Sequence, residues 1–123
     1  MYKNFGQFIN GKWQHGNNNE TYDVINPATE EIIGKPSKAS TEDIDNALKS
    51  AEKGFKVWKQ FSPWDRAAIL RKIADHVRTK TNELAKWMTL ETGKPLVESV
   101  AEVVASADIF EWNAEETKRI YGQ

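Results

Sequence analysis

Over about the first forty positions, apolar residues come in short runs separated by turn residues. Runs of this kind at residues 8–9, 12–13, 22–25 and 32–33 are typical of strands. Asn10-Gly11 separates the first two runs and predicts a type I′ turn, because both positions tolerate positive φ. Asn26-Pro27 ends the third run, since proline has no N–H for a strand ladder. The sequence therefore predicts short strands and hairpins over about residues 7–36.

From about residue 41 to 121 the apolar residues recur at helical spacing and predict four amphipathic helices. The first begins at Ser40, with Asp43 three residues later as in a capping box. The second begins at Ser62-Pro63, where serine caps and proline takes the first helical position. After a break at residues 79–82, a third helix ends at Gly93, and Pro95 opens the fourth. The predicted apolar stripes are Ile44, Ala47, Leu48, Ala51, Phe55 and Trp58; Ile69, Leu70, Ile73, Ala74 and Val77; Leu84, Trp87, Met88 and Leu90; and Leu96, Val100, Val103, Val104, Ala107, Phe110 and Ala114.

Strands followed by helices usually indicate an α+β domain, and 123 residues suit a single domain. An α/β protein cut before its main sheet would show the same order of elements. The long Val/Ile-rich runs of buried parallel strands are missing, so the helices have no sheet of that kind to cover.

Charge, hydropathy and cysteine content exclude several classes of partner and site. Seventeen basic and eighteen acidic residues give a net charge of −1, and they are interspersed without a basic block, which argues against nucleic-acid binding. The N-terminus lacks the apolar core of a signal peptide, and no apolar run approaches bilayer length, so we expect a cytoplasmic protein. The chain has no cysteine, which excludes disulfides and thiolate metal sites.

Candidate catalytic groups are sparse. The chain has no G-x-G-x-x-G motif, and Gly93-Lys94-Pro95 lacks the spacing of a phosphate loop, so Gly93 is interpreted as a helix C-cap. His15 and His76 are too isolated to suggest a metal site. The serines lie in caps or on helices without a nucleophile elbow.

The five tryptophans are many for this length, and at helical spacing they predict core or interface anchors. If the chain exists alone, part of the apolar surface that they belong to must be uncovered. Such a surface predicts self-association or poor solubility.

Four stretches, in order, resemble the opening of an NAD(P)-dependent aldehyde dehydrogenase. They are Phe8-Ile9-Asn10-Gly11-Lys12-Trp13, residues 22–29 (Tyr-Asp-Val-Ile-Asn-Pro-Ala-Thr), residues 89–95 (Thr-Leu-Glu-Thr-Gly-Lys-Pro) and residues 110–122 (Phe-Glu-Trp-Asn-Ala-Glu-Glu-Thr-Lys-Arg-Ile-Tyr-Gly). The last stretch is the most specific and is most similar to succinate-semialdehyde dehydrogenases. The resemblance covers nearly the whole chain but about the first quarter of a family member.

The resemblance implies a Rossmann-type α/β parent in which residues 1–123 form a partial N-terminal portion of the nucleotide-binding domain. It also implies a homo-oligomeric enzyme that uses NAD or NADP to oxidise a small aldehyde to a carboxylic acid. The family's catalytic cysteine, glutamate and asparagine, and its nucleotide-contacting motifs, would all fall later, so no catalytic or cofactor-binding residue is assigned. We expect this chain alone to be inactive and to bind no cofactor.

One site is implied by the resemblance. Some family members hold a structural monovalent cation between a main-chain oxygen and a carboxylate, and the matching positions here are Val24, with Ile25 as a neighbour, and Glu91. An ordinary carboxylate at a helix end is an equally good interpretation of Glu91. For the chain as a whole, the alternative to an enzyme fragment is a non-enzymatic helical interaction module or regulatory subunit.

Overall fold

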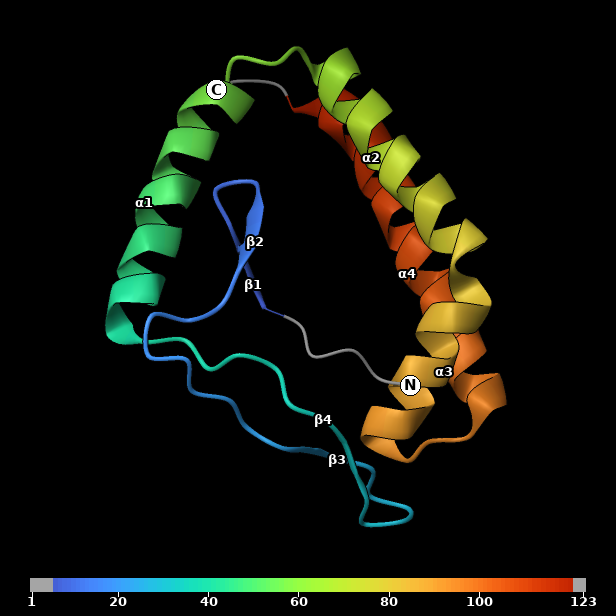
Figure 1. The fold of residues 1–123 in the computed structure, drawn as a ribbon. Coiled ribbons are helices and arrows are strands. Elements are labelled where there is room, and N and C mark those ends of the chain that lie inside the picture. Colours follow the sequence, from blue (N-terminus) through green and yellow to red (C-terminus); the bar gives the residue numbers. More distant parts are fainter. Residues whose placement is uncertain (1–5, 121–123) are drawn as a thin grey trace. The chain divides into compact units, whose positions relative to one another are not determined.

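The computed structural model describes residues 6–120 and divides the chain into two compact units, residues 1–60 and residues 61–123 (Figure 1). The first unit opens with an antiparallel hairpin of β1 (Gln7–Ile9) and β2 (Lys12–Gln14), in which Phe8 lies opposite Trp13. Asn10 and Gly11 have φ values of 53° and 76°. The predicted hairpin turn is therefore confirmed.

A second antiparallel hairpin pairs β3 (Val24–Ile25) with β4 (Ile32–Gly34). Its connection is closed by Asn26, whose N–H donates to the Glu31 carbonyl at 2.9 Å and whose Oδ1 accepts from the Ala28 N–H at 3.0 Å. The strand predicted from residue 22 is shorter than expected. It begins at Val24, and residue 21 makes only an isolated bridge to Ser37.

Helix α1 (Thr41–Trp58) begins with the predicted capping box of Ser40 and Asp43. Its apolar stripe is nevertheless not a core, because Leu48 and Phe55 are 64% and 63% exposed. The one residue that the helix buries is Asp43. The amphipathic spacing thus predicted the helix correctly, while residues 6–60 leave its apolar face largely exposed.

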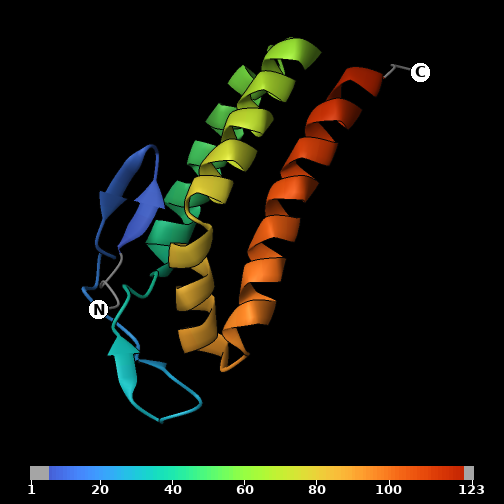
Figure 2. The same ribbon diagram turned by 90° about the vertical axis from the view of Figure 1, so that its right-hand side faces the viewer.

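The second unit consists of α2 (Pro63–Thr79), α3 (Thr81–Thr92), α4 (Leu96–Glu116) and a short 3₁₀ turn, η1 (Thr117–Arg119). Helix α3 follows α2 after a break at Lys80, and α4 returns alongside both (Figure 2). Ser62 caps α2, and Gly93 ends α3 with a φ of 75°, as the sequence predicted. The sequence also predicts a helix stop at Tyr121-Gly122, which lies outside the described residues.

The helices of the second unit meet through small side chains. The buried residues are Ala67, Ala74, Ala85, Ser99, Val103, Ala107, Ala114 and Thr117. Alanine lets helix backbones approach closely, which leaves the larger predicted core residues at the periphery, where Leu96 is 54% exposed and Phe110 and Ile73 are each 37% exposed. The predicted stripes of this unit are therefore confirmed in part: Ala74, Val103, Ala107 and Ala114 are buried, whereas the larger side chains lie at the edge of the core. Among residues 6–120, no helix has the length and apolar content to cross a bilayer.

Candidate functional site

The most buried charged side chain among residues 6–120 is Asp43, at the start of α1, which is 1% exposed. Its Oδ2 accepts from the Ser40 N–H at 2.9 Å, the Ser40 hydroxyl at 2.8 Å and the Asn17 N–H at 3.1 Å. The Ser40 hydroxyl oxygen in turn accepts from the Asp43 N–H at 3.1 Å. Beside it, the Gly16 N–H donates to the Ser37 hydroxyl at 2.7 Å, so the loop after β2 is held against the start of α1.

These hydrogen bonds favour the charged form of the Asp43 carboxyl. The Ser40 backbone N–H, then the Ser40 hydroxyl and the Asn17 N–H, lower the pKa of the carboxyl below 3.8, against the opposing effect of burial. A general base at neutral pH needs a pKa near 7. Asp43 is therefore charged at neutral pH as part of the capping box of α1, and its lowered pKa does not suit a catalytic base.

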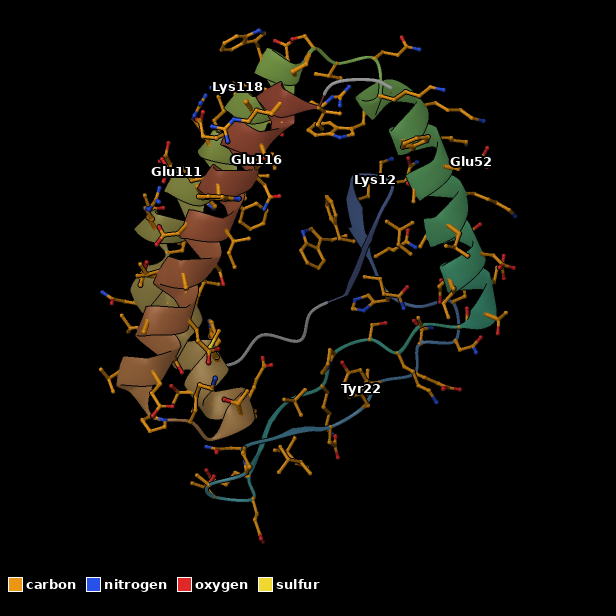
Figure 3. The ribbon with its side chains drawn as sticks, turned by 180° about the vertical axis from the view of Figure 1, so that it is seen from behind. Lys12, Tyr22, Glu52, Glu111, Glu116 and Lys118 are labelled. Atoms are coloured by element: carbon orange, nitrogen blue, oxygen red, sulfur yellow. The ribbon has the colours of Figure 1, made fainter. Side chains whose placement is uncertain are left out.

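A network of ion pairs joins α2 to α4. The Arg78 guanidinium donates to Asp108 at 2.9 Å and to Glu111 at 2.5 Å, which raises the pKa of Arg78. Arg71 pairs with Glu115, and this contact, followed by the one from Lys118, lowers the pKa of the Glu115 carboxyl. Figure 3 shows Glu111 in the C-terminal part of α4 and Lys118 in the 3₁₀ turn η1 that follows it. All these groups are solvated, so they orient the two helices and form no enclosed catalytic centre.

Beyond these pairs, Glu115 and Glu116 face Lys118 and Arg119 across a helical turn, at 3.0 Å and 2.6 Å respectively. The Lys118 ammonium also lies 4.9 Å from the centre of the Trp64 ring. This end of α4 is a charged, solvent-facing surface.

The two residues of the possible cation site lie in different units. Val24 pairs with Gly34 in the second hairpin, and Ile25 follows it as an exposed strand residue. Glu91 lies in the last turn of α3, at the edge of a hollow of about 380 Å³ whose walls include Leu84, Met88 and Val103. The structure therefore shows the surroundings of Val24 and the surroundings of Glu91 separately.

Other candidate groups do not assemble into a site. Within the described part of the chain, no three His, Asp or Glu side chains lie close enough to hold a metal ion, and neither His15 nor His76 belongs to such a group. Ser99, which the sequence did not single out, is fully buried, and its hydroxyl bonds to that of Thr89 at 2.9 Å. No local signal identifies such a residue, because its burial depends on which helices pack around it.

The helix N-termini do not fit the phosphates of a dinucleotide, which bind free N–H groups at the positive end of a helix. In α1 and α2 those positions are taken by Ser40 and Ser62, each of which accepts from the backbone N–H of an aspartate three residues later. In α3 and α4, which lack a side-chain cap, the first turn carries the carboxylates of Glu83 and Glu98, respectively. Residues 6–120 therefore provide no recognisable nucleotide-phosphate site, and the absence of a cofactor on this chain stays a prediction.

Aromatic residues are largely on the surface. Trp64 and Trp112 are each 70% exposed, and Trp13, which packs with a ring-centre distance of 5.3 Å against Phe8, is 64% exposed. The prediction that part of the apolar surface is uncovered is confirmed.

Comparison with known proteins gives a family match over nearly the whole chain. The family described as "Aldehyde dehydrogenase family" matches residues 13–123. A glutarate-semialdehyde dehydrogenase from Pseudomonas putida is 40% identical over 94% of this chain and 24% of its own length. A succinate-semialdehyde dehydrogenase [NADP(+)] from Escherichia coli is 40% identical over 93% of this chain and 24% of its own.

Solved structures give the same result. A betaine aldehyde dehydrogenase from Staphylococcus aureus in complex with NAD⁺ superposes with a TM-score of 0.94 and 31% identity over 99% of this chain and 25% of that one. An NADP-dependent enzyme of E. coli superposes with a TM-score of 0.92 and 39% identity over 97% of this chain and 25% of that one. The chain thus spans about a quarter of the length of the proteins that it matches.

Proposed function

Since the chain belongs to the aldehyde dehydrogenase family, we propose that it is the N-terminal scaffold of an NAD(P)-dependent semialdehyde dehydrogenase, within the nucleotide-binding domain. In this proposal the complete homo-oligomeric enzyme oxidises an aldehyde similar to succinate semialdehyde to the corresponding carboxylic acid. The observation that carries the proposal is the 40% identity to semialdehyde dehydrogenases of two bacteria over at least 93% of the chain.

The scaffold role follows from the chemistry of the side chains. The family's nucleophile is a cysteine thiolate, and the 123 residues contain no cysteine. No serine replaces it, because a serine nucleophile needs an adjacent base. The best-placed hydroxyls are already used in structure: Ser40 and Ser62 cap helices, and Ser99 bonds to Thr89. The chain therefore contributes helices and hairpins to the enzyme, and other residues perform the reaction.

We expect the purified chain to show no oxidation of succinate or glutarate semialdehyde with either NAD⁺ or NADP⁺. The physical reason is the missing thiolate, without which the aldehyde carbon has no nucleophile to attack it. The assay is the absorbance of reduced nicotinamide at saturating aldehyde, with the E. coli succinate-semialdehyde dehydrogenase as a positive control. Turnover above the buffer background would contradict the scaffold role.

A chimera tests the enzyme family of the complete protein. The 115 aligned residues of the P. putida dehydrogenase are replaced by the corresponding part of this chain. We expect the chimera to oxidise glutarate semialdehyde, because the scaffold has the same fold and the catalytic residues come from the relative. The control is the relative with the segment deleted, which should be inactive. A folded but inactive chimera would favour the alternative function, an independent helical interaction module or regulatory subunit, which the exposed tryptophans also support.

We further propose that Glu91 binds a monovalent cation together with the main-chain oxygen of Val24 or Ile25. Glu91 lies in the last turn of α3, which carries no basic residue. A negative charge at the negative end of a helix is unfavourable by about 0.3–1 kcal/mol, and a bound cation would offset that cost. Oxygen ligands of this type suit a hard cation.

Replacing Glu91 with glutamine tests the cation site. We expect the melting temperature of the unchanged chain to be higher in potassium chloride than in choline chloride of equal ionic strength, and the Glu91→Gln variant to lose this difference. Glu98→Gln, which removes an exposed carboxylate at the start of α4, is the matched control and should keep it. The site is wrong if the Glu91→Gln variant responds to potassium as the unchanged chain does.

A further inference from the structure

Helix α1 has an apolar face that the described residues of its unit leave exposed. Ile44, Leu48 and Phe55 follow one another at spacings of four and seven positions, so they lie on one side of the helix. Their exposed fractions are 51%, 64% and 63%. A helix with one regular apolar face normally buries that face in a core. Here the helix instead buries Asp43, on a different side.

The β1–β2 hairpin does not cover the side chains of Ile44, Leu48 and Phe55. A hollow of about 280 Å³ between the hairpin and the helix is lined on the helix side by Asn46, Lys49, Ser50 and Lys53. A second hollow, of about 310 Å³, is lined by Phe8 and Ile9 of the hairpin and by Ala47 and Ala51 of the helix. The hairpin therefore reaches the edge of the apolar face but leaves Ile44, Leu48 and Phe55 exposed. The apolar face remains available for another partner.

Helix α4 of the second unit also has an apolar side that is exposed. One side packs through Val103, Ala107 and Ala114. The opposite side carries Val97, Ile109 and Trp112, which are 75%, 62% and 70% exposed. A helix that is apolar on both sides is typical of the interior of a larger protein. Each unit thus has a helix built for more burial than the unit itself provides.

The charges around the two apolar faces favour a polypeptide over a membrane or a nucleic acid as the binding partner. Helix α1 carries four acidic and three basic residues, whereas helices that lie on membranes are rich in lysine and arginine on their polar side. The net charge of −1 is equally unsuited to nucleic acid. An exposed apolar surface with interspersed charges around it is what a protein interface requires.

The related proteins are longer than this chain, and their additional residues indicate which polypeptide would cover the two helix faces. Ninety-nine per cent of this chain superposes on one quarter of the S. aureus betaine aldehyde dehydrogenase, with a TM-score of 0.94. Elements of the same kind and order therefore exist inside a chain about four times as long. The other three quarters of such a chain are the natural cover for helix faces that this quarter leaves open.

We propose that the exposed faces of α1 (Ile44, Leu48, Phe55) and α4 (Val97, Ile109, Trp112) are each a docking surface for the remaining three quarters of an aldehyde dehydrogenase, and that they bind that remainder even when it is supplied as a separate polypeptide. The inference rests on the proposed function, because it takes the partner from the same enzyme. It adds the residues that make the contact and the ability of the two parts to assemble without a covalent link.

The test is co-expression of the full chain with the P. putida glutarate-semialdehyde dehydrogenase from which the 115 aligned residues have been removed. We expect the two polypeptides to elute together in a one-to-one complex. Leu48→Lys with Phe55→Lys should weaken the complex by at least roughly 100-fold, because two buried apolar side chains are each replaced by a charge. Val97→Lys with Ile109→Lys should have a comparable effect from the second face.

A charge-matched control separates burial from charge. Glu42→Lys changes the net charge of α1 by the same amount at an exposed position roughly a third of a turn away from Leu48 and Phe55. This variant should leave binding unchanged. Since Leu48 and Phe55 are exposed in the chain by itself, their replacement should also leave the melting of the free chain unchanged.

Four results would overturn the docking surfaces. They are the absence of a complex with the unchanged chain, a complex that the lysine variants do not weaken, a free chain that the α1 variants destabilise, and self-association of the free chain that the same variants abolish. The last of these would make a second copy the occupant. A complex that forms but oxidises no semialdehyde would leave the docking surfaces intact and would count against the proposed function instead.

Discussion

Replacing Asp43 with alanine is expected to destabilise the first unit more than removal of an ordinary helix cap. The carboxylate accepts from the Ser40 N–H and hydroxyl and from the Asn17 N–H, which lies 26 residues away in the chain. Loss of Ser40 as a cap should cost about 1 kcal/mol. Asp43→Ala should cost more than Ser40→Ala, because it leaves several buried donors without an acceptor at once. Urea unfolding of the two variants measures the difference.

The pH dependence of this contribution has a definite sign. The pKa of Asp43 is lowered from 3.8 in the folded chain, so the folded state favours the charged form. Its stabilisation is complete above the unfolded pKa and is lost as the pH falls below 3.8 through the depressed folded pKa. We expect Asp43→Asn to remove this component of acid unfolding, as measured by circular dichroism between neutral and acidic pH.

Asp65 provides the matched control for Asp43. It holds the same position at the start of α2, with its Oδ2 bonded to the Ser62 hydroxyl at 2.6 Å, and it is exposed. Asp65→Ala should have a smaller effect, since it breaks a local, solvated cap. Equal losses from Asp43→Ala and Asp65→Ala would contradict the role of the long-range bond to Asn17.

Enlarging Ala107 to leucine is expected to destabilise the second unit by about 1–3 kcal/mol, because a well-packed core must shift to accept the added carbons. Ala107 is fully buried, and α4 packs against both α2 and α3. The measurement is the thermal or urea unfolding of the full chain, followed by the helix signal.

Ala105 offers a control on the same helix. It is exposed, so Ala105→Leu makes the same chemical change without a packing conflict and should alter stability by less than about 0.5 kcal/mol. If the two leucine variants unfold alike, the alanine contacts of α4 are not the core of this unit.

The sequence predicted the family, and the comparisons confirm it. It also predicted the order of strands and helices, the Asn10-Gly11 turn, the Ser40 and Ser62 caps and the Gly93 end of α3, all of which the structure confirms. These features depend on neighbouring residues only: a turn residue that tolerates positive φ, a hydroxyl three residues from an N–H, or apolar positions at helical spacing. The Val24 and Glu91 cation site and the absence of cofactor binding stay predictions.

What the sequence by itself determined is therefore local, namely where each element begins, which face of it is apolar, and that no cysteine is present for thiolate catalysis. Only the tertiary structure decided which apolar faces are buried. It placed Ala107 and Ser99 in the core of the second unit, left Leu48 and Phe55 exposed, and joined Asp43 to Asn17. The physical reason is that periodicity reports the direction in which a side chain points, whereas burial depends on what lies opposite it, and that comes from distant parts of a chain or from another polypeptide.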